Sequence, residues 1–157
     1  MNERVSEVYS LLVPLADSRL LVPRTCVAEV ISYQLPSQMN GAPPWYLGRV
    51  SWSGKQVPLI SFECACGQAL PPMGSRAHIV ILHALGERLE AGCFAILAQG
   101  FPQLVRVGSD MIKPDLSYAV NEHHPVLCRV RMLNETPLIP DMERLEALIA
   151  DETRVLG

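Results

Sequence analysis

Short apolar segments separated by proline, glycine and polar turn residues follow one another along most of the 157-residue chain. Residues 104–107 and 126–132 alternate apolar and polar positions with a period of two, which is typical of strands with one buried face. Residues 77–82 are apolar except for His78 and predict a buried strand. The pattern predicts strands at 8–13, 19–22, 46–52, 56–60, 77–82, 93–97, 104–107, 126–132 and 137–139, and a brief one near Tyr118.

Helical periodicity is clear only at the C-terminal end. Asp141 follows Pro140 and can cap a helix over 141–150. Met142, Leu145, Leu148 and Ile149 fall on one face of this helix, and Glu143, Arg144 and Glu146 are expected on the exposed side. A second, short helix is considered between Arg24 and Val30. The fold class is therefore all-β with a C-terminal helix.

One sequence element occurs twice. Val57-Pro58-Leu59-Ile60 and Thr136-Pro137-Leu138-Ile139 each follow a strand and a turn, and a Pro/Gly-rich connection at 67–74 separates the two copies. Such an echo favours two similar barrels in tandem, with halves 8–74 and 75–140 inside one domain of residues 7–150. Because Pro58 has no N–H to donate, its strand is expected to lie at an edge or to contain a bulge.

Composition restricts the function. The hydrophobic fraction is 49%, the net charge is −3 and only two lysines are present, so nucleic-acid binding is not favoured. The N-terminal residues Asn2-Glu3-Arg4 do not resemble a signal peptide, and no apolar run is long enough for membrane insertion. Five scattered cysteines suggest free thiols, so the chain is expected to be cytoplasmic.

The residues that could carry chemistry form no recognisable catalytic set. Cys64 and Cys66 are separated by one residue, whereas zinc sites normally use a two-residue spacing and a second ligand pair. His123 and His124 lie in a predicted loop without a nucleophile motif. We therefore predict no enzyme activity, no metal and no cofactor. A small Cys/His metal-binding or enzymatic β-barrel protein remains the alternative.

An aromatic segment is the more promising feature. Trp45, Tyr46 and Trp52 lie within eight residues, and alternation would place Tyr46, Gly48, Val50 and Trp52 on one face of a strand. This composition is common in protein interfaces, although a buried Trp52 would equally fill a barrel. An SH3-like module that binds proline-rich peptides is a second alternative. Gly48 and Gly54 are expected to allow a close backbone approach and a hairpin turn.

The order of these segments resembles the CheW family over residues 8–149. The family pattern contains a strand ending in Pro, a V-x-E-V-I segment, a P-x-[FY]-hydrophobic-G element, an N-L-R-G turn, a Pro-containing return strand, and a similar return before a terminal helix. The corresponding segments here are 20–23, 27–31, 44–48, 50–54, 57–60 and 136–141.

The resemblance implies two tandem SH3-like five-stranded barrels around a shared apolar seam. It also implies a non-catalytic adaptor that couples the regulatory domain of a CheA-type histidine kinase to the cytoplasmic tip of a methyl-accepting chemoreceptor. The residues expected at the partner-binding surfaces are Val27, Glu29, Gly48, Arg49, Trp52 and Ser53.

The turn departs from the family pattern. Ser51 replaces the family Asn, Ser53 replaces the family Arg, and Arg49 occupies a position that is apolar in the family. One hypothesis is that the charge of Arg49 substitutes for the missing Arg. These changes suggest an accessory CheW-like protein of an alternative pathway, for example one that controls twitching by type IV pili.

Overall fold

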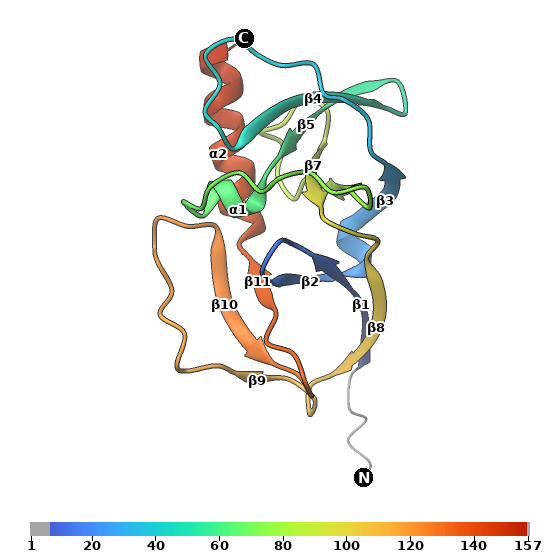
Figure 1. The fold of residues 1–157 in the computed structure, drawn as a ribbon, viewed down its shortest axis with the longest axis vertical. Helices are drawn as coiled ribbons and strands as arrows, with labels where there is room; N and C mark the ends of the chain where they lie inside the picture. Colours follow the sequence, from blue (N-terminus) through green and yellow to red (C-terminus); the bar gives the residue numbers. More distant parts are fainter. Residues whose placement is uncertain (1–6, 157) are drawn as a thin grey trace.

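Two β-sheets and a C-terminal helix make up the computed structural model, which describes residues 7–156 (Figure 1). The helices are α1 (Phe62–Ala65), α2 (Met142–Leu156) and the 3-10 turn η1 (Arg24–Cys26). The strands are β1 (Glu7–Pro14), β2 (Arg19–Pro23), β3 (Val27–Ser32), β4 (Tyr46–Trp52), β5 (Lys55–Ile60), β6 (His78–His83), β7 (Cys93–Ala98), β8 (Gln103–Gly108), β9 (Lys113–Pro114), β10 (Val126–Arg131) and β11 (Leu138–Pro140). The predicted all-β class with a C-terminal helix is confirmed, but the second sheet has six strands and not the expected five.

The two sheets exchange hairpins between the halves of the sequence. The first barrel has the strand order β3-β6-β7-β5-β4, and the second has β8-β1-β2-β11-β10-β9. The β6–β7 hairpin of the second half therefore completes the first barrel, and the β1–β2 hairpin of the first half completes the second barrel. The sheets thus differ from a simple tandem arrangement over 8–74 and 75–140.

The repeated Pro-Leu-Ile element occupies the same topological position in both barrels. β5 pairs antiparallel with β4 and parallel with β7, where Leu59 lies opposite Ala95. In the same way β11 pairs antiparallel with β10 and parallel with β2, where Leu138 lies opposite Leu20. β5 is an interior strand, so the edge position expected for Pro58 is wrong. The β4–β5 pair does contain a bulge, but the bulge lies in β4, between Tyr46 and Gly48.

Alternating side chains supply three apolar cores. In β7, Phe94 and Ile96 point into a seam between the barrels, whereas Cys93, Ala95 and Leu97 point into the first barrel. β2 divides its residues similarly between the seam and a smaller core inside the second barrel. Successive side chains point to opposite faces of a strand, so a strand with two buried faces must be continuously apolar. This explains the continuous apolar residues 79–82 of β6 and 93–98 of β7.

Helix α2 packs against the seam and extends beyond the predicted 141–150. Met142, Leu145 and Ile149 are buried in the seam core, and the Asp141 carboxylate accepts a hydrogen bond from the N–H of Arg144 at 3.0 Å. Glu146, expected to be exposed, is only 2% exposed, because its Oε1 accepts the N–H of Gly86 in the β6–β7 connection. The segment considered as a helix at 24–30 is one 3-10 turn followed by β3.

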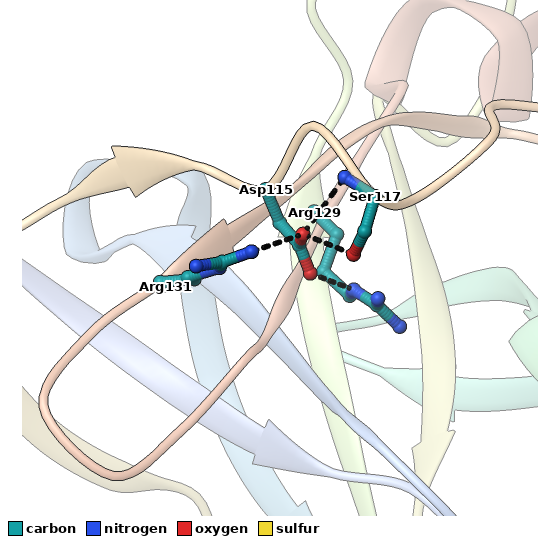
Figure 2. A network of polar contacts seen from close by, with 4 residues as sticks. All are labelled: Asp115, Ser117, Arg129 and Arg131. Atoms are coloured by element: carbon teal, nitrogen blue, oxygen red, sulfur yellow. Dashed lines mark hydrogen bonds and ion pairs between the residues drawn. The ribbon is translucent and has the colours of Figure 1, made fainter.

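A buried carboxylate holds the long connection between β8 and β10. Asp115 accepts hydrogen bonds from the hydroxyl and the N–H of Ser117 at 2.5 and 3.1 Å (Figure 2). It also forms ion pairs with Arg129 at 2.7 Å and Arg131 at 3.2 Å. The Arg129 guanidinium stacks 4.7 Å from the ring centre of Tyr118. Tyr118 therefore anchors the connection by stacking. The brief strand expected near Tyr118 lies slightly earlier in the chain, as β9.

This network predicts a pH-dependent contribution to stability. The Ser117 hydroxyl and then the Arg129 guanidinium hold the pKa of Asp115 well below its ordinary 3.8, although burial opposes them. Because the folded-state pKa is lowered, the contribution is complete above about pH 3.8 and is lost as the pH falls through the folded-state value. Asp115→Ala is expected to lower the urea midpoint at pH 7, and the difference from the parent protein is expected to shrink below pH 4.

Asp110→Ala is the matched control, because Asp110 is an exposed carboxylate in the same connection. It is expected to leave the urea midpoint nearly unchanged at every pH. A midpoint difference for Asp115→Ala that persists undiminished to pH 3 would show that the carboxylate charge is not the stabilising feature.

Candidate partner-binding surface

The first barrel closes where β3 meets β4, and several predicted site residues lie at this closure. The Trp52 indole N–H donates to Glu29 Oε2 at 2.5 Å. The Gln34 side chain donates to the carbonyl oxygen of Ser51 at 3.0 Å and accepts from its N–H at 3.1 Å. We call these four residues, Glu29, Gln34, Ser51 and Trp52, the β3–β4 closure. The amide of Gln34 satisfies the edge of β4 as a neighbouring strand would.

The β3–β4 closure is open to solvent. Glu29, Ser51 and the adjoining Ser53 are exposed, and Trp52 is half-buried against the core of the first barrel. An exposed aromatic edge held in a fixed position is typical of protein contacts, so this closure is the candidate contact surface. No described residue offers Glu29 a cationic partner within ion-pairing distance.

Gly48 has a structural role. Its φ is +136°, and a Cβ there would overlap the carbonyl oxygen of Ser37 and lie 2.9 Å from the carbonyl carbon. Ser37 exchanges two backbone hydrogen bonds with Arg49, at 2.8 and 3.0 Å, directly above this position. The close backbone approach is confirmed. Gly48 is buried, and its role in partner binding stays a prediction.

Ser53 and Gly54 form the two-residue turn between β4 and β5. Both have positive φ, +51° and +73°, as a type I′ hairpin turn requires. The turn fixes the register in which Trp52 lies opposite Lys55 and Ser51 opposite Gln56. Ser53 therefore lies exposed at the tip of a rigid hairpin, beside Trp52.

Val27 and Arg49 lie apart from the β3–β4 closure. Val27 begins β3, is half-buried and packs against the seam core. Arg49 lines a groove with Lys55 and Gln56, and Ser53 is not part of this groove. The hypothesis that Arg49 replaces the missing turn Arg at Ser53 therefore gains no support from their positions.

The aromatic residues do not form one exposed peptide-binding groove. The bulge in β4 sends Tyr46, which is 4% exposed, into the seam core, whereas Val50 and Trp52 face the core of the first barrel. Trp45 contacts Tyr46 edge-on and also packs against the seam. The expected common face is thus wrong for Tyr46, and the arrangement does not favour the alternative of an SH3-like peptide-binding module.

The cysteines and histidines also lack the geometry of a reactive site. Burial, and then the charge of Glu63, raise the pKa of Cys66 to about 12 and raise that of Cys64 as well. Both are therefore neutral thiols near pH 7 and poor nucleophiles. In the part of the chain that the structure describes, no three His, Cys, Asp or Glu side chains gather as metal ligands do.

Sequence reasoning missed an apolar surface on the outer face of the β1–β8 pair. Tyr9 is 50% exposed and lies opposite Arg106, and Leu104 is 51% exposed and lies opposite Leu11. Leu11, on the same face, packs against the seam core. Only the pairing of β1 with β8, across about a hundred residues, brings these side chains together. The local sequence pattern predicts both strands but not their partners.

The geometry defines two β-barrels that share one apolar seam. Comparison with known families identifies this domain further: the model of the CheW-like domain matches residues 10–148, so the chain belongs to the CheW-like domain family. The scaffolding protein TtCheW from Thermoanaerobacter tengcongensis has the same fold, with a TM-score of 0.74 at 14% identity over 92% of this chain and 91% of that chain. A search of curated protein sequences found no match.

None of the helices within residues 7–156 is both long enough and apolar enough to cross a bilayer.

Proposed function

We propose that this protein is a non-catalytic adaptor that couples a CheA-type histidine kinase to chemoreceptors in a chemosensory complex. The observation that carries the proposal is the β3–β4 closure, where Glu29 is fixed by the Trp52 indole on the solvent-exposed edge of a rigid barrel. Membership of the CheW-like domain family supports the scaffold role. Regulation would follow from different affinities for the active and inactive assemblies.

Two binding surfaces suit an adaptor better than one. The β3–β4 closure lies on the first barrel, and the exposed apolar residues Tyr9 and Leu104 lie on the second barrel. Separate surfaces would allow one molecule to contact the kinase regulatory domain and the receptor tip simultaneously. Such bivalent contacts raise the overall affinity by increasing the effective concentration of the second partner.

We further propose an accessory role in a pathway such as type IV pilus twitching. The support is the tip of the β4–β5 hairpin, where the exposed Ser53 offers a hydroxyl in place of the family guanidinium. A partner that binds this tip would not need a carboxylate opposite Ser53, because no guanidinium is present at that position to pair with it.

Calorimetric titration against the CheA-type regulatory domain and the chemoreceptor tip from the same organism tests the adaptor function. Saturable binding near 1:1 is expected for at least one of the two. Glu29→Arg is expected to weaken that binding by about tenfold, because it reverses a charge within the contact and removes the acceptor for Trp52.

Glu122→Arg makes the same charge change at an exposed position of the β9–β10 connection and is the matched control. Its affinity is expected to stay within about twofold of the parent protein, as is usual for charges outside a contact. The proposal fails if neither partner binds, and the β3–β4 closure is the wrong surface if both variants weaken binding equally.

A further inference from the structure

A positively charged groove lies beside the β4–β5 hairpin. It has a volume of about 620 Å³ and lies between this hairpin, the β6–β7 connection and the C-terminal part of α2. Figure 1 shows β4, β5 and α2 together in the upper part of the molecule. The groove is lined by Arg49, Lys55, Gln56, Pro58, Arg88, Leu89, Glu90, Ala91, Ala150 and Thr153.

The charge of this groove is not neutralised from within. Arg49, Lys55 and Arg88 face it against one acid, Glu90, although the whole chain has a net charge of −3. No carboxylate of the described residues forms an ion pair with Arg49 or Lys55. Arg88 Nη1 donates to the neutral carbonyl oxygen of Glu143 at 3.4 Å, and no described carboxylate forms an ion pair with Arg88. Cations held close together without counter-charges attract an anionic partner.

The floor of the groove is apolar. Pro58 and Leu89 are buried, and Ala91 and Ala150 are half-buried beside them. An apolar floor with a cationic rim matches a segment that carries both carboxylates and apolar side chains. Nucleic acid would need a longer track of basic residues than these three.

The two-residue turn makes this surface rigid. Because Ser53 and Gly54 fix the hairpin register, Lys55 and Gln56 begin β5 directly beside β4, where Arg49 projects. Side chains on a rigid hairpin lose less conformational entropy on binding than those on a mobile loop.

We propose that this groove is a second docking site that binds an acidic segment of a partner protein, with Asp or Glu side chains on Arg49, Lys55 and Arg88 and an apolar side chain over Leu89 and Pro58. The site borders the β3–β4 closure, because Gln56 Nε2 donates to Ser51 Oγ at 3.0 Å, but none of the four residues of that closure lines it.

Fluorescence anisotropy with a labelled peptide of alternating Glu and Leu tests the proposal on the full chain, with a Lys/Leu peptide as the charge control. Only the Glu/Leu peptide is expected to bind. The double variant Arg49→Glu/Lys55→Glu is expected to weaken its affinity by at least about tenfold. The milder Arg49→Gln/Lys55→Gln is expected to weaken it by about threefold. Backbone amide shifts of 49–58 and 88–91 should move on titration.

Arg24→Glu/Arg76→Glu is the matched control, because it makes the same change in net charge at two exposed arginines outside the groove. If this control variant weakens the affinity for the Glu/Leu peptide equally, the effect comes from net charge alone and the proposed site is wrong. Equally strong binding of pyrophosphate would overturn the acidic segment in favour of a small anion. Groove shifts that depend on protein concentration alone would instead identify a second copy of this chain as the occupant.

The outcome is independent of the proposed adaptor function. Glu29→Arg, which tests that function, is expected to leave the affinity for the Glu/Leu peptide within about twofold, because Glu29 lies outside the groove. Absence of saturable peptide binding by the parent protein at low salt would overturn the docking site and leave the β3–β4 closure unaffected.

Discussion

Gly48→Ala is expected to lower the free energy of unfolding by about 3 kcal/mol, because the new Cβ meets backbone rather than a movable side chain. The Cβ would overlap the carbonyl oxygen of Ser37 and lie 3.1 Å from the Cβ of Pro36. The φ of +136° adds strain that no L side chain avoids. Relief requires residues 36–37 to move away from β4, which breaks the two hydrogen bonds between Ser37 and Arg49. Urea unfolding measured by tryptophan fluorescence gives the change.

Gly54→Ala separates backbone strain from steric overlap. Gly54 has a φ of +73° but no atom within 4 Å of a Cβ, so the expected cost is only about 1 kcal/mol. Gly74→Ala, with open space and no positive φ, is expected to change stability by less than about 0.5 kcal/mol. If Gly48→Ala costs no more than Gly54→Ala, residues 36–37 do not pack on β4 in solution.

Gly48 is therefore a poor position for variants that map the partner-binding surface. A substitution at Gly48 would weaken partner binding by distorting the β3–β4 closure, whether or not a partner touches that position. Glu29 and Ser53 are better probes, because their side chains are exposed and remote from the backbone overlap.

Phe94→Ala is expected to cost about 4 kcal/mol and still to give a single unfolding transition. Phe94 is fully buried in the seam core, which combines residues of both barrels and of α2. Neither barrel contains a complete set of strands from one half of the sequence. Loosening the seam should therefore destabilise both barrels together. Calorimetry, compared with the van't Hoff enthalpy, measures both the loss and the cooperativity.

Phe101→Ala is the matched control, because this phenylalanine is 69% exposed and lies edge-on against the ring of His78. The expected change is about 0.5 kcal/mol. Two separate transitions in Phe94→Ala would contradict the view that the exchanged hairpins make the barrels one cooperative unit.

Much of the fold could be predicted from local patterns. Alternation and apolar runs predicted the principal strands, and Asp141 with the apolar positions after it predicted the start of α2. The repeated Pro-Leu-Ile element predicted two similar barrels, and both copies occupy equivalent positions. Ser53-Gly54 predicted a hairpin turn, and Gly48 a close approach of backbone. Each of these properties depends on residues near one another in the chain.

The candidate site was only partly predictable. Glu29 follows from the family resemblance and Trp52 from the aromatic segment, and the structure places both, with the adjoining Ser53, at one end of the first barrel. Gly48 was selected with them and is buried. Arg88 and Lys55 were not selected, because a basic groove built from two separate connections and a helix leaves no local pattern.

Local sequence is sufficient to specify most strands and the terminal helix, because hydrophobic period, turn residues and helix caps act over a few residues. The exchange of the β1–β2 and β6–β7 hairpins was decided only by tertiary structure, since either barrel offers a hairpin an apolar face of similar chemistry. Tertiary structure also decided that Glu146 is buried. In the helix, Glu146 is one polar position among several. Only the N–H of Gly86, sixty residues away in the chain, makes burial of its carboxylate favourable.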